Sequence, residues 1–443
     1  MAKLAFRRAA CSPRWRERFL ECTPSVTSTG RLEEEKTLRE APSTVVAITG
    51  RPENQLLICC ARVSSEMGNA GQIKALLRRS LDWEYLLEMG AEHRMLPLVY
   101  WHLSSASPEA VPENILSQLR YGFRTNKLRA LLLAKELLDL HELFERRKIP
   151  IIPYKGPVLA ASVYGDLGLR MSGDLDLLIR VQDVPEAKEM LVLRGYKPTP
   201  WKADTRLTPD QEAAFLRFER EYPFEHNDSG IGVELQWGVT DRHFPFSLDM
   251  EFMKERLQRV SLGGGTVPSF APDVMLLILC VHASVHHWER LQWICDVAET
   301  IRVCQKVDWN CVMERAAALG GERMLLLGLH LAHELLGADI PGCASSRIEA
   351  DPVVGKLAAE VYGGFFQRHE ERRGILEGSL FRPFHYRMHE RRRDRFRYTL
   401  HTMIDPNSAD WVRYPLPERL FPLYYVIRPL RLAGKYVYRA AKR

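Results

Sequence analysis

The sequence lacks several features that mark common classes of protein. No apolar run is long enough to cross a bilayer, which argues against a transmembrane helix. The nine cysteines include no Cys-x-x-Cys pair, which argues against a structural zinc site and against a disulfide framework. A glycine-rich loop of the Gly-x-x-x-x-Gly-Lys-Ser type is also missing, so the commonest sequence signature for phosphate binding is absent.

Net charge and cysteine usage further limit the class of protein and its expected compartment. A net charge of +6 is mild for 443 residues, so it permits an acidic ligand such as a nucleotide without requiring nucleic acid. The first 22 residues are basic but contain no apolar segment of the kind found in signal peptides. Together with the odd number of scattered cysteines, this predicts a cytoplasmic protein.

The pattern of apolar residues divides the chain into five regions. Residues 1–48 are polar, which predicts a disordered tail. Apolar residues recur at helical spacing over 49–147, and strand-like and helical segments alternate over 148–262. Helical patterns return over 263–345, and residues 346–443 are basic and aromatic. We therefore expect an α+β protein, in which a small mixed sheet is flanked by N-terminal and C-terminal helical regions.

The central region carries the expected sheet. The sequence predicts strands at 149–154 and 174–180, helices at 157–165 and 184–194, and a hairpin with strands at 224–227 and 232–237. The prolines of the first strand place it at a sheet edge or at a strand end. Further along, residues 274–304 are expected to form one long helix or a pair of helices.

Two aspartates stand close together at the start of the second strand. Asp174 and Asp176 would point to the same face, because side chains at i and i+2 of a strand share a face. Carboxylates that close repel each other and raise one pKa unless a cation lies between them. A divalent metal is the economical explanation, since Mg²⁺ binds carboxylates together with phosphate oxygens. The alternative is a turn in which the aspartates only cap or solubilise the strand end.

Three neighbouring features favour a site for a metal and a nucleotide. Ser172-Gly173 permits close approach of the backbone to a ligand. Lys155-Gly156 lies at an apparent strand-to-helix junction, where free backbone N–H groups favour phosphate. Glu234 belongs to another strand-like segment, which could bring a third carboxylate beside the pair.

At these residues the sequence resembles the nucleotidyltransferase superfamily related to DNA polymerase beta. More narrowly, most of residues 55–340 is similar to a bacterial branch labelled nucleotidyltransferase family protein. The matching positions are Lys155, Gly156, Pro157, Leu159, Ala160, Tyr164, Arg170, Asp174, Asp176, Leu177, Leu178, Glu234 to Trp237, His282, His286 or His287, Trp288, Leu291, Trp293 and Asp296. Gln236 stands where relatives often carry His.

The resemblance implies a nucleotidyltransferase that depends on Mg²⁺ (or Mn²⁺). In such an enzyme an acceptor hydroxyl attacks the α-phosphate of an NTP. ATP is a candidate for this NTP. Asp174, Asp176 and Glu234 would be the catalytic and metal-binding residues. The NTP would be bound by Lys155, Gly156, Arg170, Ser172 and Gly173. The sequence does not identify the acceptor. Two alternatives stay open, a catalytically silent nucleotide-binding or scaffold protein of the same fold, and a kinase-like phosphotransferase.

Two further clusters have less specific explanations. His282 and His286 lie one helical turn apart and could bind zinc, but hydrogen bonding within a helical domain or a position facing the nucleotide cleft is the favoured interpretation, also for His287. Residues 382–397 and 421–442 mix arginines with aromatic side chains. We expect this C-terminal segment to be part of the fold, and contact with an anionic membrane surface is the alternative.

Overall fold

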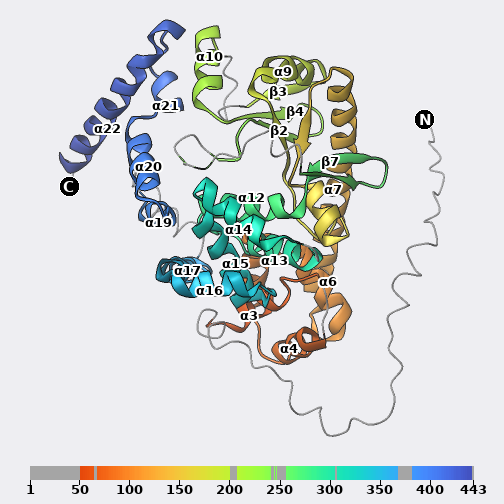
Figure 1. The fold of residues 1–443 in the computed structure, drawn as a ribbon. Helices are drawn as coiled ribbons and strands as arrows, with labels where there is room; N and C mark the ends of the chain where they lie inside the picture. The colour runs from red at the N-terminus through yellow and green to blue at the C-terminus, as the bar shows by residue number, and fades with distance from the viewer. Residues whose placement is uncertain are drawn as a thin grey trace, which may run out of the picture. The chain divides into compact units, whose positions relative to one another are not determined.

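The computed structural model describes residues 50–63, 67–199, 207–240, 244, 246, 256–304, 307–367 and 382–441, all of which belong to the unit Ala41–Arg443 (Figure 1). The predicted tail, 1–48, lies outside the described residues. Helices surround a mixed five-stranded sheet and a two-stranded sheet, so the predicted α+β class is confirmed. The boundaries predicted after residues 147, 262 and 345 stay predictions.

The five-stranded sheet brings together strands that are distant in the sequence. Its order is β1 (Ile151–Pro153), β2 (Asp174–Ile179), β5 (Gly232–Gln236), β4 (Glu221–His226) and β3 (Tyr196–Pro198). The β2–β5 pair is parallel and the other three pairs are antiparallel. β1 lies at an edge, as its prolines predicted. The two-stranded sheet is a hairpin of β6 (Leu257–Ser261) and β7 (Thr266–Phe270).

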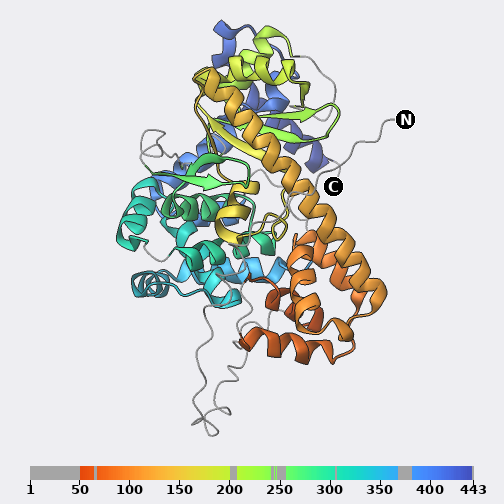
Figure 2. The ribbon, with the colours of Figure 1, turned by 90° about the vertical axis from the view of Figure 1, so that its right-hand side faces the viewer.

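The two faces of the large sheet pack against different helices. One face joins a core with α7 (Glu113–Arg146), α9 (Val184–Leu193) and α10 (Pro209–Phe218) through alternate strand residues such as Leu175 and Val233. α7 buries residues three and four apart on one side, and Figure 2 shows it running along the sheet. The opposite face is turned toward the central helices and carries the site described below.

The helices that share one hydrophobic core with this second face come from both sides of the sheet in the sequence. They are α3 (Pro52–Cys59), α4 (Met67–Leu77), α5 (Trp83–Glu92), α6 (Leu96–Ala106), α12 (Pro272–Val285), α13 (Leu291–Val303), α14 (Trp309–Leu319), α15 (Glu322–Leu336), α16 (Gly342–Ala350) and α17 (Pro352–Gly364). The segment 274–304 is thus a pair of helices. The break follows α12, where His287 and Trp288 adopt left-handed backbone conformations that no α-helix can continue.

The helix expected at 157–165 differs from its prediction. Only α8 (Pro157–Leu159) is α-helical, and it continues as the wider π-helical turn η2 (Ala160–Tyr164). The Ser162 hydroxyl donates to the Val158 carbonyl oxygen at 2.8 Å, which competes with the regular backbone ladder. Wider turns of this kind are frequent beside functional sites.

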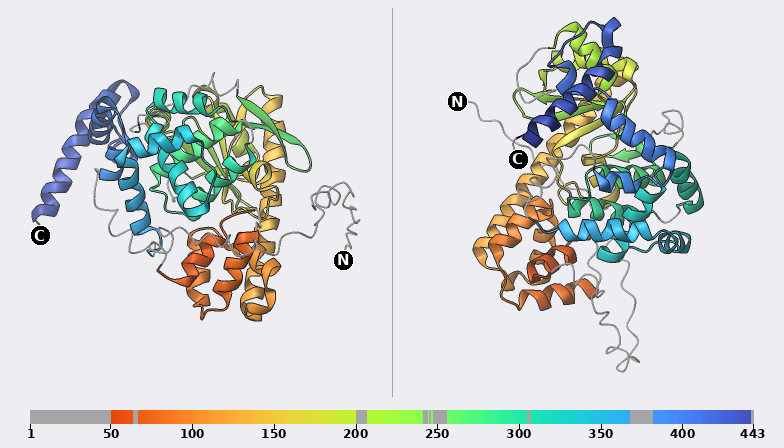
Figure 3. Two further views of the ribbon diagram at one scale, coloured as in Figure 1. Left: turned by 60° about the horizontal axis from the view of Figure 1, so that its bottom comes forward. Right: turned by 90° about the vertical axis from the view of Figure 1, so that its left-hand side faces the viewer.

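The C-terminal helices contact the rest of the fold on one side, and the last of them extends away from it in the left view of Figure 3. They are α19 (Pro383–Met388), α20 (Arg392–Ile404), α21 (Ser408–Trp411), η4 (Glu418–Leu423) and α22 (Tyr424–Ala441). Trp411, Phe421 and Tyr424 are buried against Phe215 and Phe218 of α10. The segment is therefore part of the fold, as expected. Among the described helices, none combines the length and the apolar character that crossing a membrane requires.

Candidate active site

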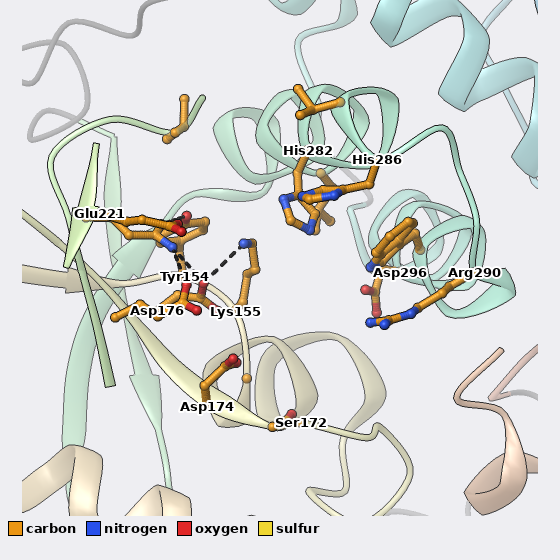
Figure 4. A pocket seen from close by; sticks show the side chains of 18 of the residues that line it. Tyr154, Lys155, Ser172, Asp174, Asp176, Glu221, His282, His286, Arg290 and Asp296 are labelled. Carbon is orange, nitrogen blue, oxygen red and sulfur yellow. Dashed lines mark hydrogen bonds and ion pairs between the residues drawn. The ribbon is translucent and has the colours of Figure 1, made fainter. Parts of the chain in front are cut away.

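A cavity of about 500 Å³ opens between the second face of the sheet and the helices α12 and α13 (Figure 4). Carboxylates from the strands line one part of it, and the helical part combines basic, aromatic and apolar side chains with Glu289 and Asp296. All the site residues predicted from the sequence contribute to its wall, namely Lys155, Gly156, Arg170, Ser172, Gly173, Asp174, Asp176 and Glu234.

The register of two parallel strands brings the predicted carboxylates together. Asp176 on β2 is paired with Glu234 on β5, and Asp174 is paired with Gly232. Paired residues share a face, so all three carboxylates point to the cavity, while Val233 is fully buried on the opposite face. A side chain at position 232 would come within 3.3 Å of the Asp174 Cβ atom. Glycine therefore leaves space beside Asp174.

The carboxylates repel one another. Burial, followed by the charges of Asp176, Glu221 and Asp174, raises the pKa of Glu234 to about 8. Burial and Asp176 also raise the pKa of Asp174. Glu221 is a fourth carboxylate of the cavity, and it was missed because the hairpin was expected to begin only at Phe224. In the structure β4 extends to Glu221, which pairs with Gln236.

Gln236 and Lys155 hold the carboxylates in place. The Gln236 Nε2 atom donates to Asp176 Oδ1 at 3.0 Å and to Glu234 Oε2 at 2.8 Å, and the Tyr154 hydroxyl donates to Gln236 Oε1. The Lys155 ammonium lies 3.2 Å from Asp176 Oδ1, and Figure 4 shows this contact. Burial disfavours the charge of Lys155, but Asp176, Tyr154 and Glu234 together outweigh burial and raise the pKa of Lys155 overall. No role for Gln236 was predicted from the sequence, where it stands in place of a His of the relatives.

The donor set fits Mg²⁺ in its chemistry, because it consists of several carboxylate oxygens whose repulsion a cation would relieve. In the part of the chain that the structure describes, however, no three His, Cys, Asp or Glu side chains converge closely enough to hold a metal ion. One oxygen of Asp176 is already bound by Lys155 and Gln236. The ligand types for a metal are present, but they are arranged around the Lys155 ammonium.

Gly156 allows the Lys155 loop to approach the start of β2. Its φ of 59° is in the left-handed region, and a Cβ atom would lie 3.2 Å from the Asp174 carbonyl oxygen. Both facts explain why glycine follows Lys155. The loop thereby places Lys155 directly beside the carboxylates.

Comparison with known families agrees with this geometry. Residues 79–337, more than half of the chain, match the model of a family described as uncharacterised nucleotidyltransferase. The chain belongs to this family. The match includes every predicted site residue and confirms the resemblance inferred from the sequence. No curated protein matches the chain. Membership supports nucleotidyl transfer in general, and a nucleotide as substrate.

In this member of the nucleotidyltransferase family, Arg170 is engaged inside the protein. Its Nε and Nη2 atoms donate to the two oxygens of Asp296 at 2.8 Å each, and Asp296 is fully buried. The Tyr164 hydroxyl also donates to Asp296, at 2.6 Å. The Arg170 Nη1 atom reaches Ser172 Oγ at 3.3 Å. Arg170 therefore anchors the loop that leads to Asp174, although it also lines the cavity.

We expect the Asp296→Asn variant to lose about 3 kcal/mol of unfolding free energy, because it leaves the buried Arg170 guanidinium without a counter-charge. Urea unfolding followed by circular dichroism would measure this loss. The double variant Arg170→Met/Asp296→Leu removes both charges and should recover part of the stability. If Asp296→Asn unfolds at the wild-type urea concentration, the buried ion pair does not anchor this loop.

The histidines divide between two environments. His282 and His286 line the cavity with Trp293, and their ring centroids lie 4.7 Å apart. Burial, followed by nearby cations such as Lys155, lowers the pKa of His282 well below its usual value, so this ring is neutral. His287 stacks instead on Phe384, with 4.7 Å between the ring centroids. Of the two interpretations favoured from the sequence, a position facing the cleft therefore applies to His282 and His286.

Proposed function

We propose that the protein transfers a nucleoside monophosphate from an NTP to an acceptor hydroxyl, with Mg²⁺ or Mn²⁺ as its cofactor. One observation carries the proposal. Asp174, Asp176 and Glu234 share one face of adjacent parallel strands inside a cavity, where the pKa values of Asp174 and Glu234 are raised. Such a concentration of negative charge beside a lysine suits a cation and a phosphate.

In the proposed reaction the acceptor oxygen attacks the α-phosphorus, the bond to the β-bridging oxygen breaks, and pyrophosphate leaves with that electron pair. Glu234 would accept the proton of the acceptor hydroxyl, because a bound cation would offset the repulsion that raises its pKa and keep its carboxylate ionised. Lys155 would donate hydrogen bonds to phosphate oxygens. Asp174, Asp176 and Glu234 would hold a metal ion once they move closer together than they stand here, and the ion would neutralise them and stabilise charge on the phosphate oxygens.

A catalytically silent nucleotide-binding protein is the second candidate. The Lys155–Asp176 ion pair favours it, because an ammonium group occupies the place where a metal ion would help catalysis. A kinase-like phosphotransferase would use the same carboxylates but a different leaving group.

Purified protein incubated with NTP, Mg²⁺ and a cell extract distinguishes the three candidates. Transfer of label from the α-phosphate supports nucleotidyl transfer, transfer from the γ-phosphate supports a kinase, and binding without transfer supports the silent protein.

Glu234→Gln should lower turnover about 100-fold, as expected when a general base is lost. Stability should not fall, because the change removes repulsion from Asp176 and Glu221 while the Gln oxygen can still accept from Gln236. Initial rates and thermal melts would test both statements. Glu225→Gln, on the exposed part of β4, is the matched control. A variant that melts much earlier but keeps its activity would make Glu234 a structural residue.

A further inference from the structure

A second group of charges lines the same cavity and plays no part in the chemistry above. Arg94 follows the last turn of α5, and Arg290 is the residue before α13. Among the described residues, neither guanidinium has an ion-pair or hydrogen-bond partner. Arg290 lies over the Trp293 ring, 5.4 Å from its centroid. Both arginines also border an adjoining cavity of about 290 Å³.

Two hydrogen bonds to His93 hold the residue before Arg94 against the start of α13, next to Arg290. The Leu291 N–H donates to His93 Nδ1 at 3.1 Å, and the Gln292 N–H donates to the His93 carbonyl oxygen at 3.3 Å. Arg94, the next residue, has a φ of 58°, which is uncommon for a side-chain-bearing residue. A left-handed residue held by buried contacts is a form of local strain that clusters at ligand sites.

Glu289 lines this part of the cavity with the two arginines, but among the described residues neither arginine forms an ion pair with a carboxylate. Burial, followed by the positive charges of Arg290 and Arg170, lowers the pKa of Arg94. Asp174 and Asp296 act in the opposite direction, but Asp296 is already paired with Arg170. Two like charges held together without a counter-ion favour an anionic ligand.

The basic groups are spread along one wall rather than gathered at one point. His282 lies within the electrostatic influence of Lys155, Arg170 and Arg290. Figure 4 shows Lys155 between Asp176 and the side of the cavity that holds His282 and Arg290. This side of the cavity therefore leads from the carboxylates past Lys155 toward Arg290. A ligand that carries several negative charges in a row would match this arrangement.

We propose that Arg94 and Arg290 bind the β- and γ-phosphates of the NTP. The assignment rests on the proposed function, because it requires the α-phosphate to lie beside Lys155 and the carboxylates. Guanidinium groups bind phosphate oxygens in a fork geometry, which makes arginine well suited to a polyphosphate chain. The two arginines would thereby stabilise the leaving pyrophosphate and favour triphosphates over monophosphates.

Inorganic tripolyphosphate tests the proposal without turnover. We would measure its binding to the full-length protein by calorimetry in EDTA, for the wild type, Arg94→Gln and Arg290→Gln. Each variant should weaken binding at least about 10-fold, as expected when a charged hydrogen bond is lost. Arg78→Gln, an exposed arginine outside the cavity, should bind like the wild type. Gln keeps most of the side-chain length and the same backbone requirement at position 94.

A second measurement identifies the source of the phosphates. Tripolyphosphate should compete with a non-hydrolysable NTP analogue in Mg²⁺. The proposal is overturned if the wild type does not bind tripolyphosphate, or if both variants bind it with wild-type affinity. Binding that depends on the arginines but leaves the NTP analogue in place also overturns it, and would assign the arginines to an anionic acceptor. Arg290→Lys should restore part of the affinity, which excludes simple misfolding.

The test of the two arginines and the test of nucleotidyl transfer can fail separately. Loss of tripolyphosphate binding in the variants is observed whether or not the protein transfers nucleotides. Conversely, the labelled-NTP experiment reports on transfer even if the two arginines bind nothing.

Discussion

The Asp176→Asn variant is expected to lower turnover at least ~100-fold, because it removes the charge at the centre of the carboxylate group. Asp176 contacts both Lys155 and Gln236 and lies opposite Glu234 in the sheet. Asn has nearly the same shape, and its oxygen can still accept from Lys155 and Gln236. The fold should therefore survive. Stability should fall only modestly, because the Lys155 ammonium loses the negative charge of its ion-pair partner. Initial rates at saturating NTP and a thermal melt would measure the two effects.

Asp228→Asn is the control for this experiment, because Asp228 is exposed in the turn between β4 and β5 and does not line the cavity. It should keep wild-type activity. A folded Asp176→Asn variant with full activity would show that Asp176 does not serve the reaction. The carboxylates would then be a structural feature of the sheet, and the nucleotide-binding alternative would be strengthened.

The carboxylates could be predicted because their arrangement follows from local periodicity. Asp174 and Asp176 share a face for the simple reason that strand side chains alternate. The exposure of Glu234 to the same face follows from the apolar residues on either side of it. Only the pairing of β2 with β5 is non-local, and there the family resemblance indicated which segments belong together.

The partners of these residues could not be predicted in the same way. Arg170 and Asp296 are 126 residues apart, and no spacing in the sequence relates them. Arg94 and Arg290 line the same cavity, and hydrogen bonds join His93, the neighbour of Arg94, to the start of α13. Glu221 was missed for a different reason, since Pro223 obscures the strand signal before Phe224. Tertiary contacts between helices and strands decide all of these positions.

The C-terminal helices illustrate a surface pattern that has two physical meanings. Arginines mixed with aromatic residues suit an anionic membrane surface, but they also suit a segment that buries one side and exposes the other. Here Asp410 is fully buried, and Arg431 and Arg428 of α22 lie 2.5 Å and 3.4 Å from its oxygens. At least two arginines of α22 therefore neutralise a buried carboxylate of the protein.

Deletion of residues 421–443 should lower the unfolding free energy by about 5 kcal/mol or more. The truncation removes the buried Phe421 and Tyr424 side chains, and it leaves the buried Asp410 carboxylate without its two arginines. Lower solubility and a lower melting temperature would confirm the role in folding, and Asp410→Asn should rescue part of the loss.

Vesicle co-sedimentation at low and high salt tests the alternative, which is binding to an anionic membrane surface. Each exposed basic residue near such a surface contributes about 1 kcal/mol, and added salt weakens this contribution. A stable, active truncated protein that no longer sediments with anionic vesicles would instead make this segment a membrane-surface element.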